Sequence, residues 1–400
     1  KTRYKSKKQK SSKALILIEI FDYFEPSGYH YVSPYSGKQK LFLGDYITSY
    51  SGTPFSGFSK YSLAIFSIAN IEETNLEKGH AFHLEIRNYL NALAWGDQAI
   101  EILDMGFLKT GKNKNDLHAA IEYVVRFFVA KQIIPVILGG KNSFSYLIFR
   151  AFAELQPQIC FSEIKPEIEL ALTDNKYSYL EQILISKDPV LSNFASVGYQ
   201  TYLVSPFHLE FIKRLGFEAY RLGNLRTNIA LSEPVLRDTD ILSVDMGSVK
   251  QADFPAINLP HPNGFTSDEI CQLMRFAGMS DNLRAIGFFN FHPSFDVNAQ
   301  SAMLLAQTIW HFLEGFSMRR RENPLGEEGQ FSRYLVESGQ INGEIVFFKS
   351  LLTGRWWLFL PAAMSSHGEA LISCSSEDYT SSCNNEIPER LWKFLQREQN

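Results

Sequence analysis

Short apolar runs alternate with longer amphipathic segments from residue 61 onward. The run Leu63–Ile68 precedes an expected helix over about His80–Leu93, and the segment Asp116–Lys131 has apolar residues at helical spacing. The run Ile133–Leu138 then ends in Gly139-Gly140. The same alternation predicts strands at Ile168–Leu172, Ala195–Gly198, Ala219–Leu222, Ile241–Val244 and Ala285–Phe291, and helices at about Ser143–Leu155, Tyr177–Ile185, Asp268–Phe276 and Ala302–Phe316.

The expected strands lack the polar alternation of a half-exposed sheet, so both of their faces must be covered. Repeated strand–helix units produce a parallel sheet with right-handed crossovers. The pattern therefore predicts a three-layer α/β/α domain with a mainly parallel sheet over residues 61–318. In such sheets functional residues gather at the carboxyl ends of the strands.

Both ends of the chain differ from this middle part. Residues 1–60 combine a basic tail with an irregular, aromatic lead-in that is rich in turn residues. Residues 319–400 form a C-terminal extension, in which Glu344–Phe348 and Trp356–Leu360 predict a β-hairpin and Pro388–Gln396 predicts a terminal helix. Aromatic residues in these added segments, including Trp356-Trp357, are typical of a hairpin core, and they are also candidates for a partner surface.

Charge and composition restrict the partners and the compartment. The net charge of -4 and the pI of about 6.2 give no indication of nucleic-acid binding. Residues 1–13 carry basic residues and no acidic one, which indicates a solvated tail that could contact an acidic surface. The apolar stretch Ala14–Ile18 is too short for the core of a signal peptide, and no segment approaches the ~20 apolar residues of a transmembrane helix. Four cysteines without metal-ligand spacing favour a reducing compartment, and we expect a cytoplasmic protein.

Three expected strand ends carry residues that together resemble a known family. They read ILGGKNS over Ile137–Ser143, LTDNKYS over Leu172–Ser178 and SVDMG over Ser243–Gly247. These stretches resemble the GGDHS, DAHxD and SxDxD motifs of the arginase/agmatinase/formimidoylglutamase (ureohydrolase) family. Three further segments in matching order are similar to its GPxxIR, TP…GGLT and VEVNPxxD segments, namely Gly79–Arg87, Pro260–Thr266 and Phe289–Asp296. The resemblance covers Gly79 to Phe316 and implies an arginase-like fold.

In that family the three motifs hold two manganese ions through two histidines and four aspartates. The resemblance places the six ligand positions at Asn142, Asp174, Lys176, Ser178, Asp245 and Gly247. Of these, Asp174 and Asp245 keep a ligand type. Asn is a weak neutral ligand, and a protonated Lys has no lone pair to donate. The resemblance therefore implies a metal site that is mostly lost, so we expect no cofactor, with Mn²⁺ as the alternative.

Lysines have entered the same motifs, at Lys141 and Lys176. One hypothesis is that an ammonium group takes the space and the charge of a lost metal, since buried charges must be paired. The alternative is that both lysines reach water from the strand ends. Asp174 and Asp245 could equally be capping residues.

Four residues are expected to border the pocket: Lys141, His261, Asn290 and His292. The histidines could be substitute ligands or bases, or ordinary hydrogen-bonded side chains. Asn290 stands where the family has a glutamate that binds a guanidinium group. His80 and His83 share one helix face, but their order is not HExxH, and we expect an ordinary helix face there.

The missing ligands predict a catalytically inactive member of the family, retained as a binding or scaffold subunit. Its expected partner is another protein or further copies of the chain, because family members assemble as oligomers. Two alternatives remain open. One is a hydrolase of C–N bonds in guanidino or formimino compounds with a single metal or a rearranged site. The other is a sensor that binds a small ligand in the old pocket.

Overall fold

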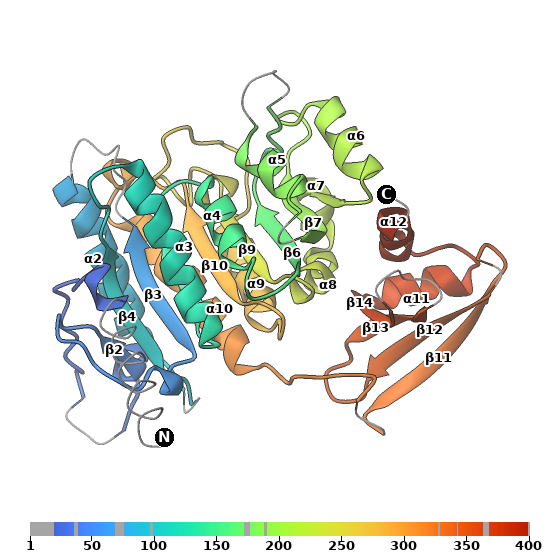
Figure 1. Cartoon of the computed structure of the whole chain (residues 1–400), viewed down its shortest axis with the longest axis horizontal. Coiled ribbons are helices and arrows are strands. Elements are labelled where there is room, and N and C mark those ends of the chain that lie inside the picture. The colour runs from blue at the N-terminus through green and yellow to red at the C-terminus, as the bar shows by residue number, and fades with distance from the viewer. Residues whose placement is uncertain are drawn as a thin grey trace, which may run out of the picture.

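The computed structural model describes residues 20–35, 39–68, 76–96, 99–171, 177–187, 190–326, 329–341, 343–362 and 368–398. Figure 1 shows a large sheet with helices on both faces and a smaller sheet that follows it in the chain. The predicted fold class, a three-layer α/β/α domain with a mainly parallel sheet, is confirmed. The basic tail lies outside the described residues. Within them, no helix is long and apolar enough to cross a membrane.

The large sheet has the strand order β1-β4-β3-β5-β10-β9-β6-β7-β8, with β2 beside β4. All described pairings in it are parallel except that of β1 with β4. The strands are β1 Phe24–Glu25, β2 Ile47–Ser49, β3 Leu63–Ile68, β4 Ile102–Leu108, β5 Ile134–Leu138, β6 Gln158–Ile164, β7 Val190–Tyr199, β8 Glu218–Arg221, β9 Ile241–Asp245 and β10 Ala285–Phe289.

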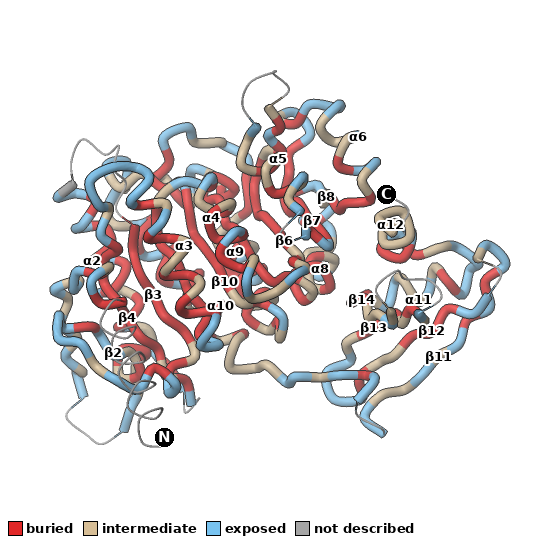
Figure 2. Tube along the Cα trace, in the orientation of Figure 1, coloured by how far each residue is buried: buried red, intermediate tan, exposed pale blue. Residues whose placement is uncertain are grey.

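Helices cover both faces of this sheet, and each face has its own apolar core. Figure 2 shows that the central strands are almost entirely buried. On one face pack α2 (Leu76–Ala92), α9 (Ser267–Gly278) and α10 (Gln300–Ser317). On the other pack α3 (Lys114–Ala130), α4 (Phe144–Ala151), α5 (Tyr179–Leu184) and α6 (Pro206–Arg214). Shorter helices complete the domain: η1 Leu43–Tyr46, η2 Phe58–Lys60, α7 Leu222–Thr227, η3 Ile229–Ser232, α8 Glu233–Arg237, η4 Met246–Ser248 and η5 Pro293–Phe295.

Helices α9 and α10 approach each other closely because glycines face the contact. A Cβ on Gly278 would lie 2.1 Å from the carbonyl oxygen of Phe312, and a Cβ on Gly315 would lie 2.2 Å from that of Arg275. A methyl group does not fit at either position. The two glycines therefore set the spacing of these helices.

Two strands in the interior of the sheet, β4 and β6, escaped the sequence prediction. Strand β6 lies between β9 and β7, and both of its faces carry a buried polar residue, Ser162 on one and Glu163 on the other. The sequence instead predicted a strand over Ile168–Leu172. The described part of that segment, residues 168–171, has no regular structure, and its apolar residues Ile168 and Leu170 pack into the core as a loop.

The C-terminal extension is larger than the predicted hairpin. It is a four-stranded antiparallel sheet in the order β11-β12-β13-β14, with β11 Phe331–Ser338, β12 Gly343–Ser350, β13 Trp356–Leu360 and β14 Ala370–Cys374. Helices α11 (Ser376–Cys383) and α12 (Glu389–Glu398) follow it. Trp356 and Trp357 are buried, so these two side chains form no partner surface.

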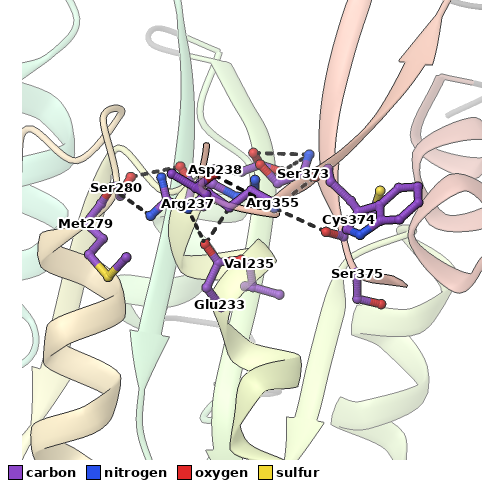
Figure 3. A network of polar contacts seen from close by, with 12 residues as sticks. Glu233, Val235, Arg237, Asp238, Met279, Ser280, Arg355, Ser373, Cys374 and Ser375 are labelled. Carbon is purple, nitrogen blue, oxygen red and sulfur yellow. Dashed lines mark hydrogen bonds and ion pairs between the residues drawn. The ribbon is translucent and has the colours of Figure 1, made fainter. Parts of the chain in front are cut away.

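Two arginines join the C-terminal sheet to the arginase-like domain. Arg237 in α8 donates hydrogen bonds to the carbonyl oxygens of Trp356 (3.0 Å) and Cys374 (3.1 Å), as Figure 3 shows in part. Arg390 in α12 forms ion pairs with Glu218 (3.3 Å) and Asp238 (2.9 Å). Burial raises the pKa of Glu218, but the charges of Arg390, Lys393 and Arg397 and the hydrogen bond from Tyr220 together outweigh burial and hold that pKa at about 2. The junction is thus a buried, charged contact.

Candidate ligand pocket and relic metal site

The carboxyl ends of four adjacent strands converge on one polar site. In the order β5-β10-β9-β6, Leu138 pairs with Phe288, Phe289 with Asp245, and Val244 with Ile164. The residues that follow these pairs therefore lie at the same edge of the sheet. They include Asn142 after β5, Asn290 after β10, Asp245 at the end of β9 and Lys165 after β6.

Asp245 is the centre of a hydrogen-bond network. Its Oδ2 accepts from the side-chain amides of Asn142 (2.6 Å) and Asn290 (2.9 Å), and its Oδ1 accepts from the backbone N–H of Gly247 (2.7 Å). The backbone N–H of Asn142 also donates to Oδ1 of Asn290 (3.1 Å). Burial raises the pKa of Asp245, and Lys165 together with these hydrogen bonds opposes that shift. The amides thus solvate a buried carboxylate.

Asn290 takes its place through an unusual backbone conformation. Its φ of 62° lies in the left-handed region, which Asn tolerates better than most residues. This conformation ends β10 directly after Phe289 and brings the amide to Asp245. Sequence analysis placed Asn142, Asp245, Gly247 and Asn290 at one site, and the structure brings these four together.

Most of the second motif, which the sequence analysis placed at Leu172–Ser178, lies outside the described residues. Asp174 and Lys176 lie outside the described residues. Ser178 caps the start of α5, where its hydroxyl accepts from the N–H of Glu181, and it also donates to the carbonyl oxygen of Glu169. The strand beside β9 is β6, and Lys165, Glu167 and Glu169 follow it at the i, i+2, i+4 spacing of the DAHxD ligands. In the sequence, this i, i+2, i+4 spacing of charged residues directly after a strand is the signal that could have identified the three residues.

Lys165 carries the positive charge of the site. The residue is 5% exposed, and its Nζ lies 2.7 Å from Oε2 of Glu169. Burial lowers the pKa of Lys165, but Glu163, Glu169 and Asp245 together outweigh burial and raise it. The ammonium of Lys165 is therefore favoured in its charged form by its ion pair with Glu169 and by the charges of Glu163 and Asp245.

Glu163 lies beneath the pocket at 1% exposure. Its Oε2 accepts a hydrogen bond from the hydroxyl of Tyr179 (2.8 Å). Burial raises the pKa of Glu163 to about 7, although Lys165 and Tyr179 act in the opposite direction. Near neutral pH this carboxyl group is divided between its neutral and its charged form.

An open pocket of about 490 Å³ lies above these groups. Its polar wall comprises Lys141, Lys165, Glu167, Glu169, Asp245, His261, Asn290 and His292. Burial raises the pKa of Glu167, and its hydrogen bond to Glu169 acts in the same direction. The Nε2 atom of His261 lies 3.7 Å from Oε1 of Glu167. All four residues that the sequence placed at the border of the pocket, Lys141, His261, Asn290 and His292, line it.

The His80 and His83 pair is not part of this wall. His83 is buried against Phe107 and Phe291, and burial lowers its pKa to about 3, so the ring is neutral. His80 is exposed and stacks on Phe107. The surroundings of these two histidines agree with the expectation of an ordinary helix face. The next turn of α2 carries Arg87, whose Nε lies 2.8 Å from Asp104 in a buried ion pair.

Comparisons with known proteins identify the family of this protein. A sequence profile described as the Arginase family matches residues 80–314. The chain therefore belongs to the arginase family.

Individual relatives are distant. Formimidoylglutamase of Bacillus subtilis is 20% identical over 197 residues, which make up 46% of this chain and 62% of that protein. Its crystal structure superposes with a TM-score of 0.61 and 16% identity, over 73% of this chain and 96% of that one. Formiminoglutamase of Trypanosoma cruzi, solved with Mn²⁺, superposes with a TM-score of 0.57 and 17% identity, over 65% of this chain and 95% of that one.

The expectation of no cofactor is overturned by these comparisons, which point to manganese. The donors in this chain fit two manganese ions poorly. Among the described residues, no group of three or more His, Cys, Asp and Glu side chains is arranged to hold a metal. The ammonium of Lys165 lies among the carboxylates instead. Two carboxyl groups that the sequence analysis did not assign to the pocket, those of Glu167 and Glu169, line it beside Asp245.

Proposed function

We propose that this arginase-family protein serves as a binding or scaffold subunit of a protein assembly rather than as a two-metal hydrolase. The observation that supports this proposal most directly is the buried Lys165, which lies next to Glu169 and acts on Asp245. Fold alone does not determine function in this family, because activity depends on the chemistry of the site.

Electrostatics gives the physical reason. A two-metal site holds two dications roughly 3.5–4 Å apart, and their repulsion must be offset by several carboxylates. Here an ammonium group adds positive charge at the strand ends, and Asn142 offers an amide where the family has a histidine. The amide of Asn142 donates to Asp245, so that carboxylate is already engaged. The site therefore stabilises one buried carboxylate and does not present it to a metal pair.

The C-terminal sheet supports a role in assembly. One of its faces packs against α11 and α12 through a core that includes Phe347 and Leu358. The cross-strand partners Leu335, Val346, Phe359 and Leu371 share the other face. Leu335 is 53% exposed on that face. Phe359 and Leu371 are half-buried and Val346 is buried, so the face offers a partner a narrow, partly exposed apolar stripe.

The test compares turnover with metal content. The purified chain is incubated with manganese, freed of unbound metal, and assayed for hydrolysis of formimidoylglutamate, arginine and agmatine. We expect no manganese-dependent turnover. Two bound manganese ions per chain together with turnover of any of the three compounds would overturn the proposal and favour a hydrolase.

A small-ligand sensor is the second candidate, because the pocket of about 490 Å³ keeps a polar, charged wall. A ligand that binds the folded state raises stability by RT ln(1 + [L]/Kd). A thermal-shift panel of amino acids and guanidines tests this candidate. A concentration-dependent rise in Tm that Glu167→Gln abolishes would favour it, and an unchanged Tm across the panel would reject it.

A further inference from the structure

Strand β11 is an edge of the C-terminal sheet, and no described strand pairs with its outer side. Figure 1 shows β11 on the side of this sheet that faces away from the large domain. The opposite edge, β14, is joined to the large domain. There the N–H of Ser373 donates to Asp238 (3.1 Å), and the carbonyl oxygen of Cys374 accepts from Arg237. Of the two edges, β11 is therefore the one that a further strand can extend.

The outer side of β11 lacks the features that commonly protect an edge strand. The strand is eight residues long, contains no Pro and no Lys, and pairs with β12 over its whole length without a bulge. Short strands, Pro, Lys and bulges are the usual means by which proteins block edge-to-edge pairing. A strand of this length without them is a ready template for another strand.

The backbone groups that point outward follow from the pairing of β11 with β12. The N–H of Leu351 donates to the carbonyl oxygen of Gln330, one residue before β11. In an antiparallel pair every second residue bonds to the neighbouring strand. The N–H and C=O groups of Arg333, Leu335 and Glu337 are therefore directed away from β12, where a further strand can bind them.

The side chains of these three residues form a self-complementary pattern. All three are exposed. If two copies of β11 pair antiparallel with Leu335 opposite Leu335, Arg333 of each copy lies opposite Glu337 of the other. Opposite charges directly across two strands stabilise a sheet, and like charges destabilise it. Parallel pairing in register would place Arg333 opposite Arg333, so the charges favour the antiparallel arrangement.

The neighbouring strand gives a second indication that a positive charge completes this edge. Glu337 lies directly opposite Glu344 of β12, and both are exposed. Neither glutamate has an ion-pair partner within the part of the chain that the structure describes. Two like charges in this position destabilise the sheet. Arg333 of a second copy, opposite Glu337, would offset that repulsion.

We propose that β11 is the interface between two copies of this chain, which pair antiparallel through this edge and join their C-terminal sheets into one. This inference rests on the proposed function as a subunit of an assembly, and it names a second copy as the partner. Backbone hydrogen bonds provide the affinity, and the alternate side chains fix the register. Because the same surface is used by both copies, the contact closes as a twofold dimer. The attachment of each C-terminal sheet through β14 is unchanged.

The experiment measures self-association of the full-length chain by sedimentation equilibrium. Arg333→Glu places two glutamates opposite each other across the interface, and Glu337→Arg places two arginines there. We expect the native chain to dimerise and each single variant to have a dimer Kd at least about tenfold higher. An equimolar mixture of the two variants should form dimers again, because each charge then lies opposite its counter-charge on the other chain.

Two controls separate charge from backbone pairing. Arg320→Glu makes the same change in net charge at an exposed position outside the sheet, and it should keep the dimer Kd of the native chain. Leu335→Pro removes an outward N–H that the pairing with β12 does not use, and Pro is tolerated at such edge positions. We expect Leu335→Pro to be monomeric and Leu335→Thr, which keeps the N–H, to dimerise.

The outcomes separate this inference from the proposed function. A native chain that stays monomeric overturns the inference, and so does a native dimer that both single charge variants retain. Equal losses in Arg320→Glu and Arg333→Glu also overturn it, because the effect would then reflect only net charge. In each of these cases a role in an assembly survives through another partner. Manganese-dependent turnover by the native chain overturns the proposed function, whatever its state of association.

Discussion

Asn142 and Asp245 join two strand ends that are not neighbours in the sheet. The amide of Asn142, after β5, donates a 2.6 Å hydrogen bond to the carboxylate of Asp245 at the end of β9, and β10 runs between these two strands. Both residues are buried. A hydrogen bond to a buried charge of this kind is worth more than one between neutral groups.

Asn142→Leu should therefore destabilise the protein. The change keeps the approximate volume and removes one donor from Asp245, so we expect the free energy of unfolding to fall by about 1.5–3 kcal/mol. Urea denaturation measures this change in the free energy of unfolding. The control is Asn258→Leu at the exposed rim of the same pocket, which should change stability by less than about 0.5 kcal/mol. Equal effects of the two substitutions would contradict the assigned role of Asn142.

Glu163 should make stability depend on pH. Its pKa rises from 4.5 to about 7 in the folded protein, so the folded state retains a proton that the unfolded state loses. The stabilising contribution is complete below about pH 4.5 and is lost as the pH rises to about 7. The shift corresponds to at most about 3 kcal/mol.

Glu163→Gln isolates this contribution, because the neutral amide keeps an acceptor for Tyr179 and does not titrate. The difference in unfolding free energy between the variant and the native protein should grow in favour of the variant from pH 4.5 to 7. A difference for Glu163→Gln that stays constant over that range would show that its pKa is not raised.

Arg390→Met should loosen the C-terminal sheet. The substitution removes the ion-pair partner of two carboxylates, the buried Glu218 and Asp238. Breaking a buried ion pair in this way costs about 3–5 kcal/mol. Limited proteolysis should then cut the connecting segment 318–330 faster. The control is Arg333→Met on the exposed edge of β11, and we expect its cleavage rate to match that of the native chain.

Gly278→Ala should be destabilising although alanine favours helices. The higher helix propensity of alanine alone would stabilise the protein by about 1 kcal/mol. The new Cβ would lie 2.1 Å from the carbonyl oxygen of Phe312, so α9 and α10 must separate, at a cost of about 1–3 kcal/mol. Gly223→Ala in α7 is the control, because a Cβ at this position would lie 3.8 Å from the nearest atom, Nε of Arg221. Thermal denaturation should show a lower Tm for the first variant and an unchanged or higher Tm for the second.

The sequence predicted the fold class because most strands are short, uniformly apolar runs. Strand β6 was missed because its polar residues find partners far away in the chain, such as Thr239 for Ser162. The outer strands of the C-terminal sheet were missed for a related reason. Residues Arg333 and Leu335 of β11 are exposed, so that edge strand lacks a clear apolar signal.

The candidate site was also predicted only in part, depending on which strands were recognised. Asn142, Asp245 and Asn290 were predicted to lie together because the segments that contain them resemble family motifs and stand at the ends of recognised strands. Lys165, Glu167 and Glu169 were not predicted, because the strand before them was not recognised. The hypothesis of an internal ammonium group was formulated for Lys141 and Lys176 and remains a prediction for them; in the structure the buried ammonium paired with a carboxylate is that of Lys165, beside Glu169.

The contact between Arg237 and the C-terminal sheet is made to the backbone. Its guanidinium group binds the carbonyl oxygens of Trp356 and Cys374, which lie on adjacent strands. Every amino acid supplies such a carbonyl, so these two hydrogen bonds do not depend on the side chains of β13 and β14, while the guanidinium also lies 4.5 Å from the ring of Trp357. The exposed side chains of the appended sheet, such as that of Leu335, can therefore change while the two domains stay joined.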